Sequence, residues 1–236
     1  LFCVDLEGNQ RWHRSLATEY GKFENRFSAT SSPLIYENLV ILQCDHYGPS
    51  YLLAINRRTG KDSWKQDRPG KWLSWSSPQL IQVDKPGQGQ PEAELVITGS
   101  LSIDGLDPRS GTPLWTVGGM RRECIPTPVT AGGQLYAVSG PSLAIRPGGR
   151  GDVTESHVVW ENPRGAPFVP SAILVGDYYY LVDEQGITTC LRIDNGERVW
   201  QKRLPGAYTA SPVATGSHIY FTSETGETTV IKAHVS

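Results

Sequence analysis

Two adjacent arginines are the residues of this chain whose types and spacing best suit chemistry with a ligand. Arg121, Arg122 and Glu123 lie in the stretch "GGMRRECIPTP", directly before a predicted innermost strand. Paired guanidinium groups can hold an anion through bidentate hydrogen bonds. The simpler interpretation is a surface cluster with a local ion pair, which contributes little to stability.

A second polar stretch, "CDHYGPSY", places Asp45, His46 and Tyr47 at the end of a predicted strand. One carboxylate and one imidazole do not make a metal site, so we interpret the stretch as structural. The stretch "GGRGDVT", from Gly148 to Thr154, contains the tripeptide Arg-Gly-Asp, which is typical of adhesive loops. A three-residue match is weak, and we favour a glycine-rich hairpin extension with solvated charges.

Motifs for nucleophilic or metal-dependent catalysis are missing from the sequence. There is no G-x-S-x-G, no H-E-x-x-H and no phosphate-binding P-loop. The other histidines, His13, His157, His218 and His234, are scattered through predicted strands and turns. No acid–base pair can be placed, and we assign no catalytic, cofactor-binding or metal-binding residue.

The four cysteines show no spacing typical of a metal site or a redox pair. Cys3 and Cys190 occupy matching positions in the predicted third strands of separate sheets, Cys44 ends a second strand, and Cys124 precedes a first strand. Matching positions in separate sheets are usually too far apart for a disulfide. We expect buried, unpaired thiols.

Composition excludes several classes of partner. The 236 residues carry a net charge of −2 and a pI near 6.2, which argues against nucleic acid or an anionic membrane as the main partner. No apolar run approaches the roughly 18 residues that span a bilayer. The 25 glycines and 17 prolines recur with the repeat described next and indicate many short strands.

A tryptophan repeat indicates the elements that position these residues. Each copy reads as a short strand, a turn that holds glycine, and a strand that ends in tryptophan; the copies end at Trp12, Trp64, Trp115, Trp160 and Trp200. Successive tryptophans are 52, 51, 45 and 40 residues apart, and about 40 residues is the size of one propeller blade. We interpret these tryptophans as structural, docked between neighbouring sheets.

Two alternating strands precede each tryptophan unit. Ser, Thr and Pro head the first of them, as in "SSPLIY", "SSPQLI" and "PTPVTA". Proline there suits an innermost strand, whose start lies outside the ladder. Trp72 and Trp75, in "GKWLSWSSP", lie just before such a strand, where loops reach the mouth of the central channel. They serve either loop packing, which we favour, or a ligand platform.

The repeats predict an all-β fold, a single propeller domain of four-stranded antiparallel blades. We expect partial blades at 1–14 and 209–234, and full blades at 27–66, 74–117, 125–162 and 169–202. The chain starts inside a third strand and ends in another, so we expect an N-terminally incomplete ring whose upstream segment supplies the last outer strand. Alternatively, the segment from Gln10 to Arg14 closes a ring of about five blades.

The repeats resemble those of pyrroloquinoline-quinone (PQQ) enzyme propellers. The stretches "AINRRTGKDSW", "LDPRSGTPLW" and "LRIDNGERVW" are similar to the family pattern A-x-D-x-x-T-G-x-x-x-W. The stretches "WSSP", "CIPTP", "FVPSA" and "LAIRPGGRGDVT" resemble PQQ-like repeat proteins of planctomycete-type bacteria, which have no assigned activity. That resemblance implies an eight-bladed ring with about two blades upstream.

The family also includes quinoprotein alcohol dehydrogenases. Their resemblance implies PQQ as a cofactor, held between a tryptophan and a disulfide of adjacent cysteines beside a Ca²⁺ ion. This chain has no adjacent cysteine pair and no acidic cluster that matches the Ca²⁺ ligands. The repeat therefore reports blade packing rather than quinone chemistry.

The sequence favours a non-catalytic binding or scaffold module, exported to the periplasm or cell surface. An unidentified protein or small molecule would dock on the loop face or the channel mouth, where Trp75, Arg121, Arg122 and Asp45 are the candidate contacts. One alternative is a quinoprotein-type oxidoreductase with cofactor ligands in the missing blades. Another is an envelope assembly factor that resembles the outer-membrane β-barrel assembly lipoprotein.

Overall fold

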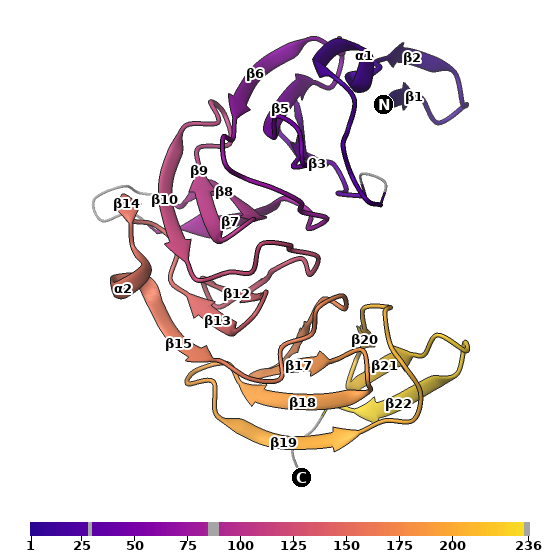
Figure 1. The fold of residues 1–236 in the computed structure, drawn as a ribbon, viewed down its shortest axis with the longest axis vertical. Coiled ribbons are helices and arrows are strands. Elements are labelled where there is room, and N and C mark those ends of the chain that lie inside the picture. The colour runs from indigo at the N-terminus through magenta and orange to yellow at the C-terminus, as the bar shows by residue number, and fades with distance from the viewer. Residues whose placement is uncertain (28–29, 85–89, 234–236) are drawn as a thin grey trace.

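The chain folds into antiparallel sheets that follow one another along a crescent (Figure 1). The computed structural model describes residues 1–27, 30–84 and 90–233. The sheets are the predicted propeller blades. The helices of the described part are α1 (Leu16–Tyr20) and α2 (Thr154–His157), and no helix there has the length and hydropathy to cross a bilayer.

Four sheets contain the four strands of a full blade. The first two contain β3 (Leu34–Tyr36), β4 (Leu39–Cys44), β5 (Tyr51–Asn56) and β6 (Asp62–Asp67), then β7 (Gln79–Val83), β8 (Glu92–Gly99), β9 (Ser102–Leu106) and β10 (Pro113–Gly118). The next two contain β11 (Val129–Ala131), β12 (Gln134–Val138), β13 (Ser142–Ile145) and β15 (Val158–Asn162), then β16 (Ile173–Val175), β17 (Tyr178–Val182), β18 (Ile187–Arg192) and β19 (Arg198–Arg203).

Two smaller sheets lie at the ends of the crescent (Figure 1). One contains β1 (Phe2–Val4) and β2 (Gln10–His13), and the other contains β20 (Val213–Thr215), β21 (His218–Thr222) and β22 (Thr228–Lys232). The alternative in which the segment from Gln10 to Arg14 closes the ring is wrong, because β2 pairs with β1 instead of β22.

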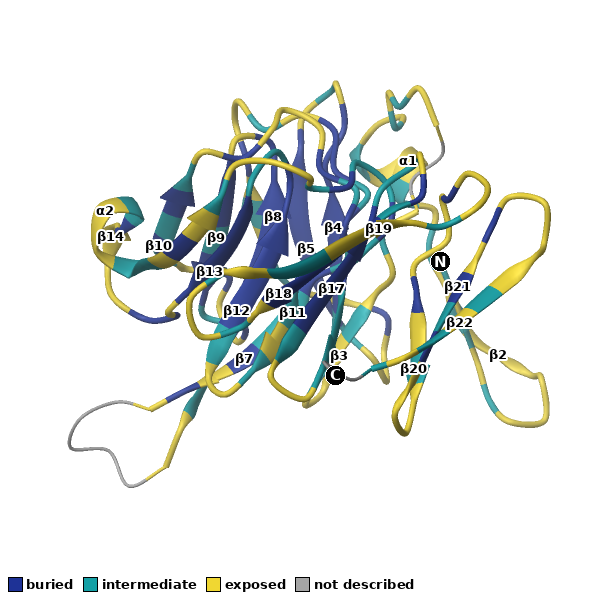
Figure 2. Ribbon diagram, turned by 90° about the horizontal axis from the view of Figure 1, so that it is seen from below, coloured by how far each residue is buried: buried dark blue, intermediate teal, exposed yellow. Residues whose placement is uncertain are grey.

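The core lies between the middle strands of neighbouring blades. β5 reads "YLLAIN" and is buried at all of its apolar positions, whereas β6, "DSWKQD", alternates between exposed and half-buried residues. A strand covered on both faces reads as a continuous apolar run, and an outer strand reads as an alternation. Figure 2 shows this gradient across the blades.

Each repeat tryptophan lies opposite a small residue on the adjacent third strand. The pairs are Cys3 with Trp12, Ala54 with Trp64, Gly105 with Trp115, Ala144 with Trp160 and Cys190 with Trp200. A small cross-strand partner leaves room for the indole to lie over the sheet. The matching register shows that the five units are equivalent.

In three blades, the indole lies against the glycine turn of the next blade. A Cβ added to the glycine would lie only 2.6 to 2.9 Å from a ring atom, and the indole N–H donates to a turn carbonyl at 2.8 to 3.1 Å. The tryptophan, glycine and acceptor are Trp12, Gly60 and Arg57; Trp64, Gly111 and Pro108; and Trp160, Gly196 and Ile193. Their contribution to stability stays a prediction.

Trp115 is arranged differently, because the next blade has an enlarged turn. Its indole N–H donates to a carboxylate oxygen of Glu94 at 2.6 Å, and the same oxygen accepts the N–H of Gly148 at 3.2 Å. The turn then adds β14 (Gly151–Asp152) to the outer edge of the β7–β10 sheet, parallel to β10. Two residues of the Arg-Gly-Asp tripeptide therefore belong to a sheet.

Hydroxyl groups link the segments that lie just before the first strands of successive blades. A backbone N–H donates to the side-chain oxygen at the matching position of the next blade, at 2.9 to 3.1 Å. The series runs from Ser32 to Ser77, Thr127, Ser171 and Ser211. The serine or threonine of the repeat therefore connects blades, which the sequence analysis did not anticipate.

We expect Thr127→Val to lower the free energy of unfolding by about 1–2 kcal/mol, because the N–H of Ser77 would lose its acceptor inside the blade interface. Urea denaturation measures the change. Thr130→Val is the matched control, since Thr130 is exposed on β11. An equal loss in both variants would contradict the link.

The cysteines are unpaired, and Cys44, Cys124 and Cys190 are buried, while Cys3 is half-buried. Burial raises the pKa of the Cys124 and Cys190 thiols to about 11 and that of Cys44 to about 12. Because the thiolate is the reactive form, these three groups should react slowly at neutral pH.

We expect a disulfide-exchange reagent to label Cys3 first and to label all four thiols only after unfolding. Rapid labelling of more than one thiol in the native protein would contradict this.

Candidate interaction site on the loop face

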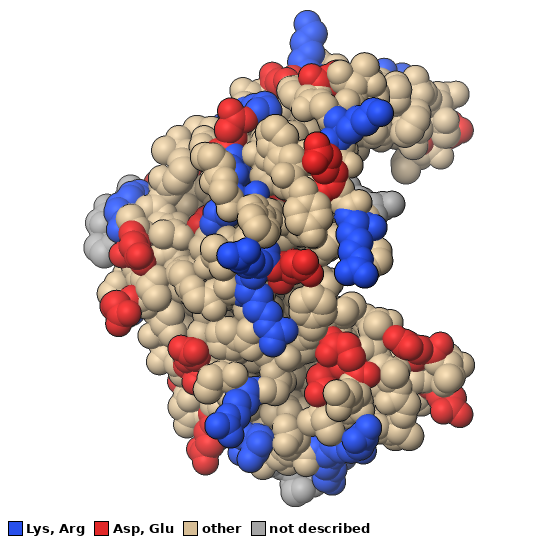
Figure 3. Space-filling model, in the orientation of Figure 1, with Lys and Arg blue, Asp and Glu red and all other residues tan. Residues whose placement is uncertain are grey.

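One face of the crescent carries the connections from each outer strand to the next blade and the loops between second and third strands. The chain reverses at every strand, so alternate connections emerge on the same side. We call this side the loop face; it points upward in Figure 2 and toward the viewer in Figure 3. Its segments include 45–50, 68–78, 119–128 and 163–172.

Five side chains form a band across the loop face, which we call the arginine–aromatic strip: Tyr47, Trp72, Arg122, Arg121 and Phe168. The rings of Tyr47 and Trp72 meet edge to face, with centroids 6.4 Å apart. The Arg122 guanidinium lies 4.7 Å from the centre of the Trp72 ring, and that of Arg121 lies 5.8 Å from the centre of Phe168. Tyr47 is 52% exposed and Trp72 is 43% exposed, so the strip is open to solvent.

Buried Cys124 ties the arginine loop to the tryptophan loop. Its N–H donates to the carbonyl of Leu73 at 3.4 Å, and its carbonyl accepts the N–H of Trp75 at 2.8 Å. Its thiol lies 3.1 Å from the carbonyl oxygen of Gly99. The two loops that meet at the strip therefore share backbone hydrogen bonds, which fixes Arg122 relative to Trp72.

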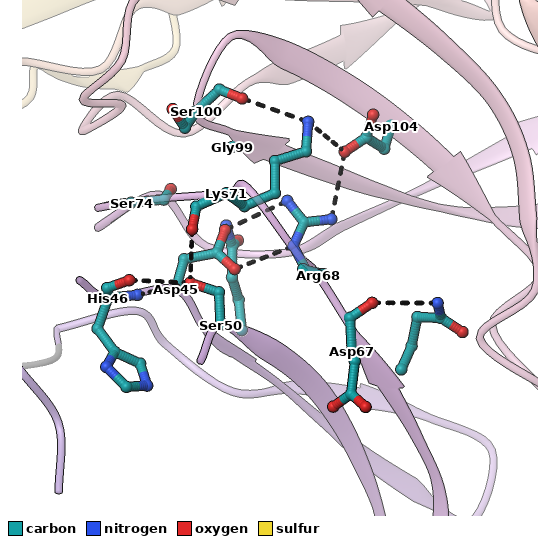
Figure 4. Close-up of polar contacts among 12 residues, drawn as sticks. Asp45, His46, Ser50, Asp67, Arg68, Lys71, Ser74, Gly99, Ser100 and Asp104 are labelled. Carbon is teal, nitrogen blue, oxygen red and sulfur yellow. Dashed lines mark hydrogen bonds and ion pairs between the residues drawn. The ribbon is translucent and has the colours of Figure 1, made fainter. Parts of the chain in front are cut away.

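An ion-pair network holds the base of the tryptophan loop (Figure 4). Arg68 donates to both carboxylate oxygens of Asp45, at 2.9 and 3.2 Å, and to Asp104 at 3.2 Å. Lys71 lies 3.3 Å from Asp104, and Gln43 donates to Asp45 at 2.8 Å. Asp45 and Arg68 are buried. The network joins the loop that carries Tyr47 to the loop that carries Trp72.

The network keeps Asp104 ionised. Burial alone would raise the pKa of this carboxyl, but the charges of Arg68 and Lys71 and hydrogen bonds from Ser102 and Thr116 outweigh it and hold the pKa below its usual value. Asp104 therefore stabilises the fold at pH values above its unfolded pKa of about 3.9, and this contribution disappears as the pH falls through the lower folded value.

We expect the stability of the protein to fall between about pH 5 and pH 2, with a smaller fall in Asp104→Asn, which has no charge to lose at that position. Urea midpoints measured across this range compare the two proteins. Asp177→Asn is the control, because Asp177 is exposed in the turn between β16 and β17, away from the network, so its curve should follow that of the parent. Parallel curves for Asp104→Asn and the parent would contradict the assignment.

Buried His46 positions Tyr47. Its Nδ1 accepts the backbone N–H groups of Glu24 and Gly48, at 3.2 and 3.1 Å. The N–H of Tyr47 in turn donates to the carbonyl of Glu24 at 3.0 Å. The imidazole therefore acts as a hydrogen-bond acceptor that shapes the loop.

The four residues that the sequence placed at the channel mouth differ in exposure and in partners. Arg121 and Arg122 are exposed on the strip, and within the described residues they have no carboxylate partner, so the expected local ion pair with Glu123 is absent. Trp75 is half-buried beside Phe27, with ring centroids 6.0 Å apart. Asp45 is 3% exposed and engaged by Arg68, so it supports the loop from beneath.

The cysteines do not fit the quinone site that the family resemblance implies. That site needs two adjacent cysteines, whereas the four cysteines here are free and belong to different blades or loops. Among the described residues, no group of three His, Cys, Asp or Glu side chains is placed to hold a metal ion.

Sequence reasoning missed Phe168, Arg68, Lys71 and Asp104. Phe168 had a usable signal, because an aromatic residue precedes the first strand here as Trp75 does in an earlier blade. The three charged residues had none, since Asp104 lies more than 30 residues after Arg68 and Lys71 and nothing in the sequence links them until the strands are placed.

Comparison with known proteins identifies the blade type. The family described as "Outer membrane protein assembly factor BamB" matches residues 1–202, and no curated protein sequence matches the chain significantly. The structure is similar to BamB from Moraxella catarrhalis, with a TM-score of 0.50, 17% identity, and coverage of 97% of this chain and 75% of that one.

Two other solved structures are similar at low sequence identity. Quinohemoprotein alcohol dehydrogenase from Comamonas testosteroni gives a TM-score of 0.60 at 11% identity, covering 78% of this chain and 42% of that one. BBS1N in complex with ARL6DN gives a TM-score of 0.57 at 13% identity, covering 86% and 68%. These likenesses confirm the all-β propeller fold.

Proposed function

Because the chain belongs to the PQQ-like propeller family described as outer membrane protein assembly factor BamB, we propose that it is a non-catalytic binding module that docks a partner protein on the loop face. The observation that carries this proposal is the arginine–aromatic strip, which is exposed, continuous and built from four separate loops. We place the protein in the cell envelope, exported to the periplasm or cell surface, as an extension of the same proposal.

The composition of the strip supports protein binding. Tryptophan, tyrosine and arginine are the residues that most often dominate the energy of protein interfaces. In a monomer, solvated aromatic rings contribute little to the stability of the fold, since their apolar surface stays in contact with water. The strip exposes Tyr47 and Trp72 although the chain has a well-formed core elsewhere.

The rigid support beneath the strip also favours binding. The Arg68 network and the Cys124 loop contacts fix the strip before a partner arrives. Preorganised side chains lose less conformational entropy on association, so more of the contact energy contributes to affinity.

Site-specific photo-crosslinking in cells that produce the protein tests this function. A photoreactive amino acid at Tyr47 or Arg122 should capture one discrete protein, whereas the same group at Asp177, in a turn on the opposite face, should not. Trp72→Ala should reduce the Tyr47 crosslink strongly. Crosslinks that form equally from Asp177, or that do not respond to Trp72→Ala, would overturn the proposed site.

A further inference from the structure

We propose that the segment bound by the strip is an acidic, extended peptide that carries aromatic side chains; this inference rests on the proposed function. The starting point is a contrast among arginines. Arg14, Arg109 and Arg192 each meet a carboxylate of this chain. Arg121 and Arg122 also lie near aromatic rings, as Arg14 and Arg109 do, but within the described residues they meet no carboxylate.

Neither guanidinium donates a hydrogen bond to a described residue, so the N–H groups of both are available. A guanidinium that lies over a ring uses its flat face for the cation–π contact, and its five N–H donors point outward in the plane. A carboxylate fits two such donors at once. The rings restrict the orientation of each guanidinium, so both arginines are prepared for a planar acidic group.

The two arginines diverge, which gives the site its length. Arg122 reaches back to Trp72 in the loop before β7, and Arg121 reaches forward to Phe168 in the loop before β16. Tyr47 extends the strip beyond Trp72. An extended chain presents every second side chain to the same side. A peptide whose facing positions, two residues apart, carry acidic and aromatic side chains in turn therefore matches a row of guanidiniums and rings better than a compact ligand does.

The charges around the strip favour a peptide over a nucleic acid. Figure 3 shows acidic side chains beside the basic ones on this face. The whole chain has a net charge of −2, and a phosphate backbone needs a longer run of cations than two adjacent arginines. Carboxylates spaced along a peptide demand fewer positive charges.

Two labelled twelve-residue peptides test the inference: one carries glutamate and tyrosine in turn at every second position, with serine between them, and the other carries glutamine in place of each glutamate. Fluorescence anisotropy with the protein should show at least ten-fold tighter binding of the glutamate peptide, weakening with salt because exposed charges are screened. The double variant Arg121→Gln/Arg122→Gln should bind both peptides equally. Arg109→Gln, which alters an exposed arginine in a turn on the opposite face, should keep the preference.

Three results would overturn the inference: equal affinity for the two peptides, a glutamate preference that survives in the double variant, or tighter binding of a labelled twelve-nucleotide oligothymidine. Thermal unfolding of each variant checks that it is folded. Failure here is distinguishable from failure of the proposed function, because crosslinking through Tyr47 that depends on Trp72 would persist with a partner of different chemistry.

Discussion

Trp115→Ala should lower the free energy of unfolding by about 3–5 kcal/mol, the range measured when a buried aromatic side chain is emptied from a core. Trp115 is 2% exposed and lies over Gly105. Its removal would leave a cavity between two blades and would take a donor from the buried carboxylate of Glu94. Both losses act in the same direction.

Two further variants separate packing from the hydrogen bond. Trp115→Phe keeps much of the apolar area but lacks the donor, so its loss should be clearly smaller than that of the alanine variant. Trp64→Ala should fall in the same range as Trp115→Ala, because its ring lies on Gly111 of the next blade.

Arg122→Ala is the control for this series and should change stability by no more than about 0.5 kcal/mol, since its side chain is exposed. Urea denaturation followed by far-UV circular dichroism measures all four proteins. Equal effects of Trp115→Ala and Arg122→Ala would contradict the assignment of the repeat tryptophans to blade packing.

The repeat made the fold predictable from the sequence because each blade contains the same local sequence signals. Glycine turns, alternating strands and a terminal tryptophan recur five times, and each copy supports the interpretation of the others. The one enlarged turn shows what the repeat could not predict. The enlarged turn "RPGGRGDVTESH" still predicted an extension, but not that β14 would join the neighbouring sheet, because such pairing depends on where two blades meet.

The candidate site was predictable only in part. The sequence placed Arg121, Arg122 and the tryptophans before first strands, and topology then brought them to one face. It could not show that Arg122 faces Trp72, about 50 residues earlier. It also gave no sign that Gly99 is needed, where an added Cβ would lie 2.3 Å from the Arg68 guanidinium.

Arg68→Met should cost about 3–5 kcal/mol, because it would leave the buried carboxylate of Asp45 without its counter-charge. The methionine side chain fills much of the same volume. The loss of stability therefore reflects the missing charge more than a cavity. Gln43 would remain as a neutral donor, and Asp104 would keep Lys71. Urea denaturation measures the loss.

The double variant Asp45→Asn/Arg68→Met distinguishes a penalty for an unpaired charge from a general disturbance of the loop. Removing both charges together should recover part of the loss, so that the double variant is more stable than Arg68→Met alone, with a coupling energy of about 1–3 kcal/mol. Strictly additive losses would show that Arg68 acts through packing alone. The network joins the loops of Tyr47 and Trp72. Peptide binding by the double variant therefore shows whether binding needs the ion pair itself or only the loop shape that the ion pair maintains.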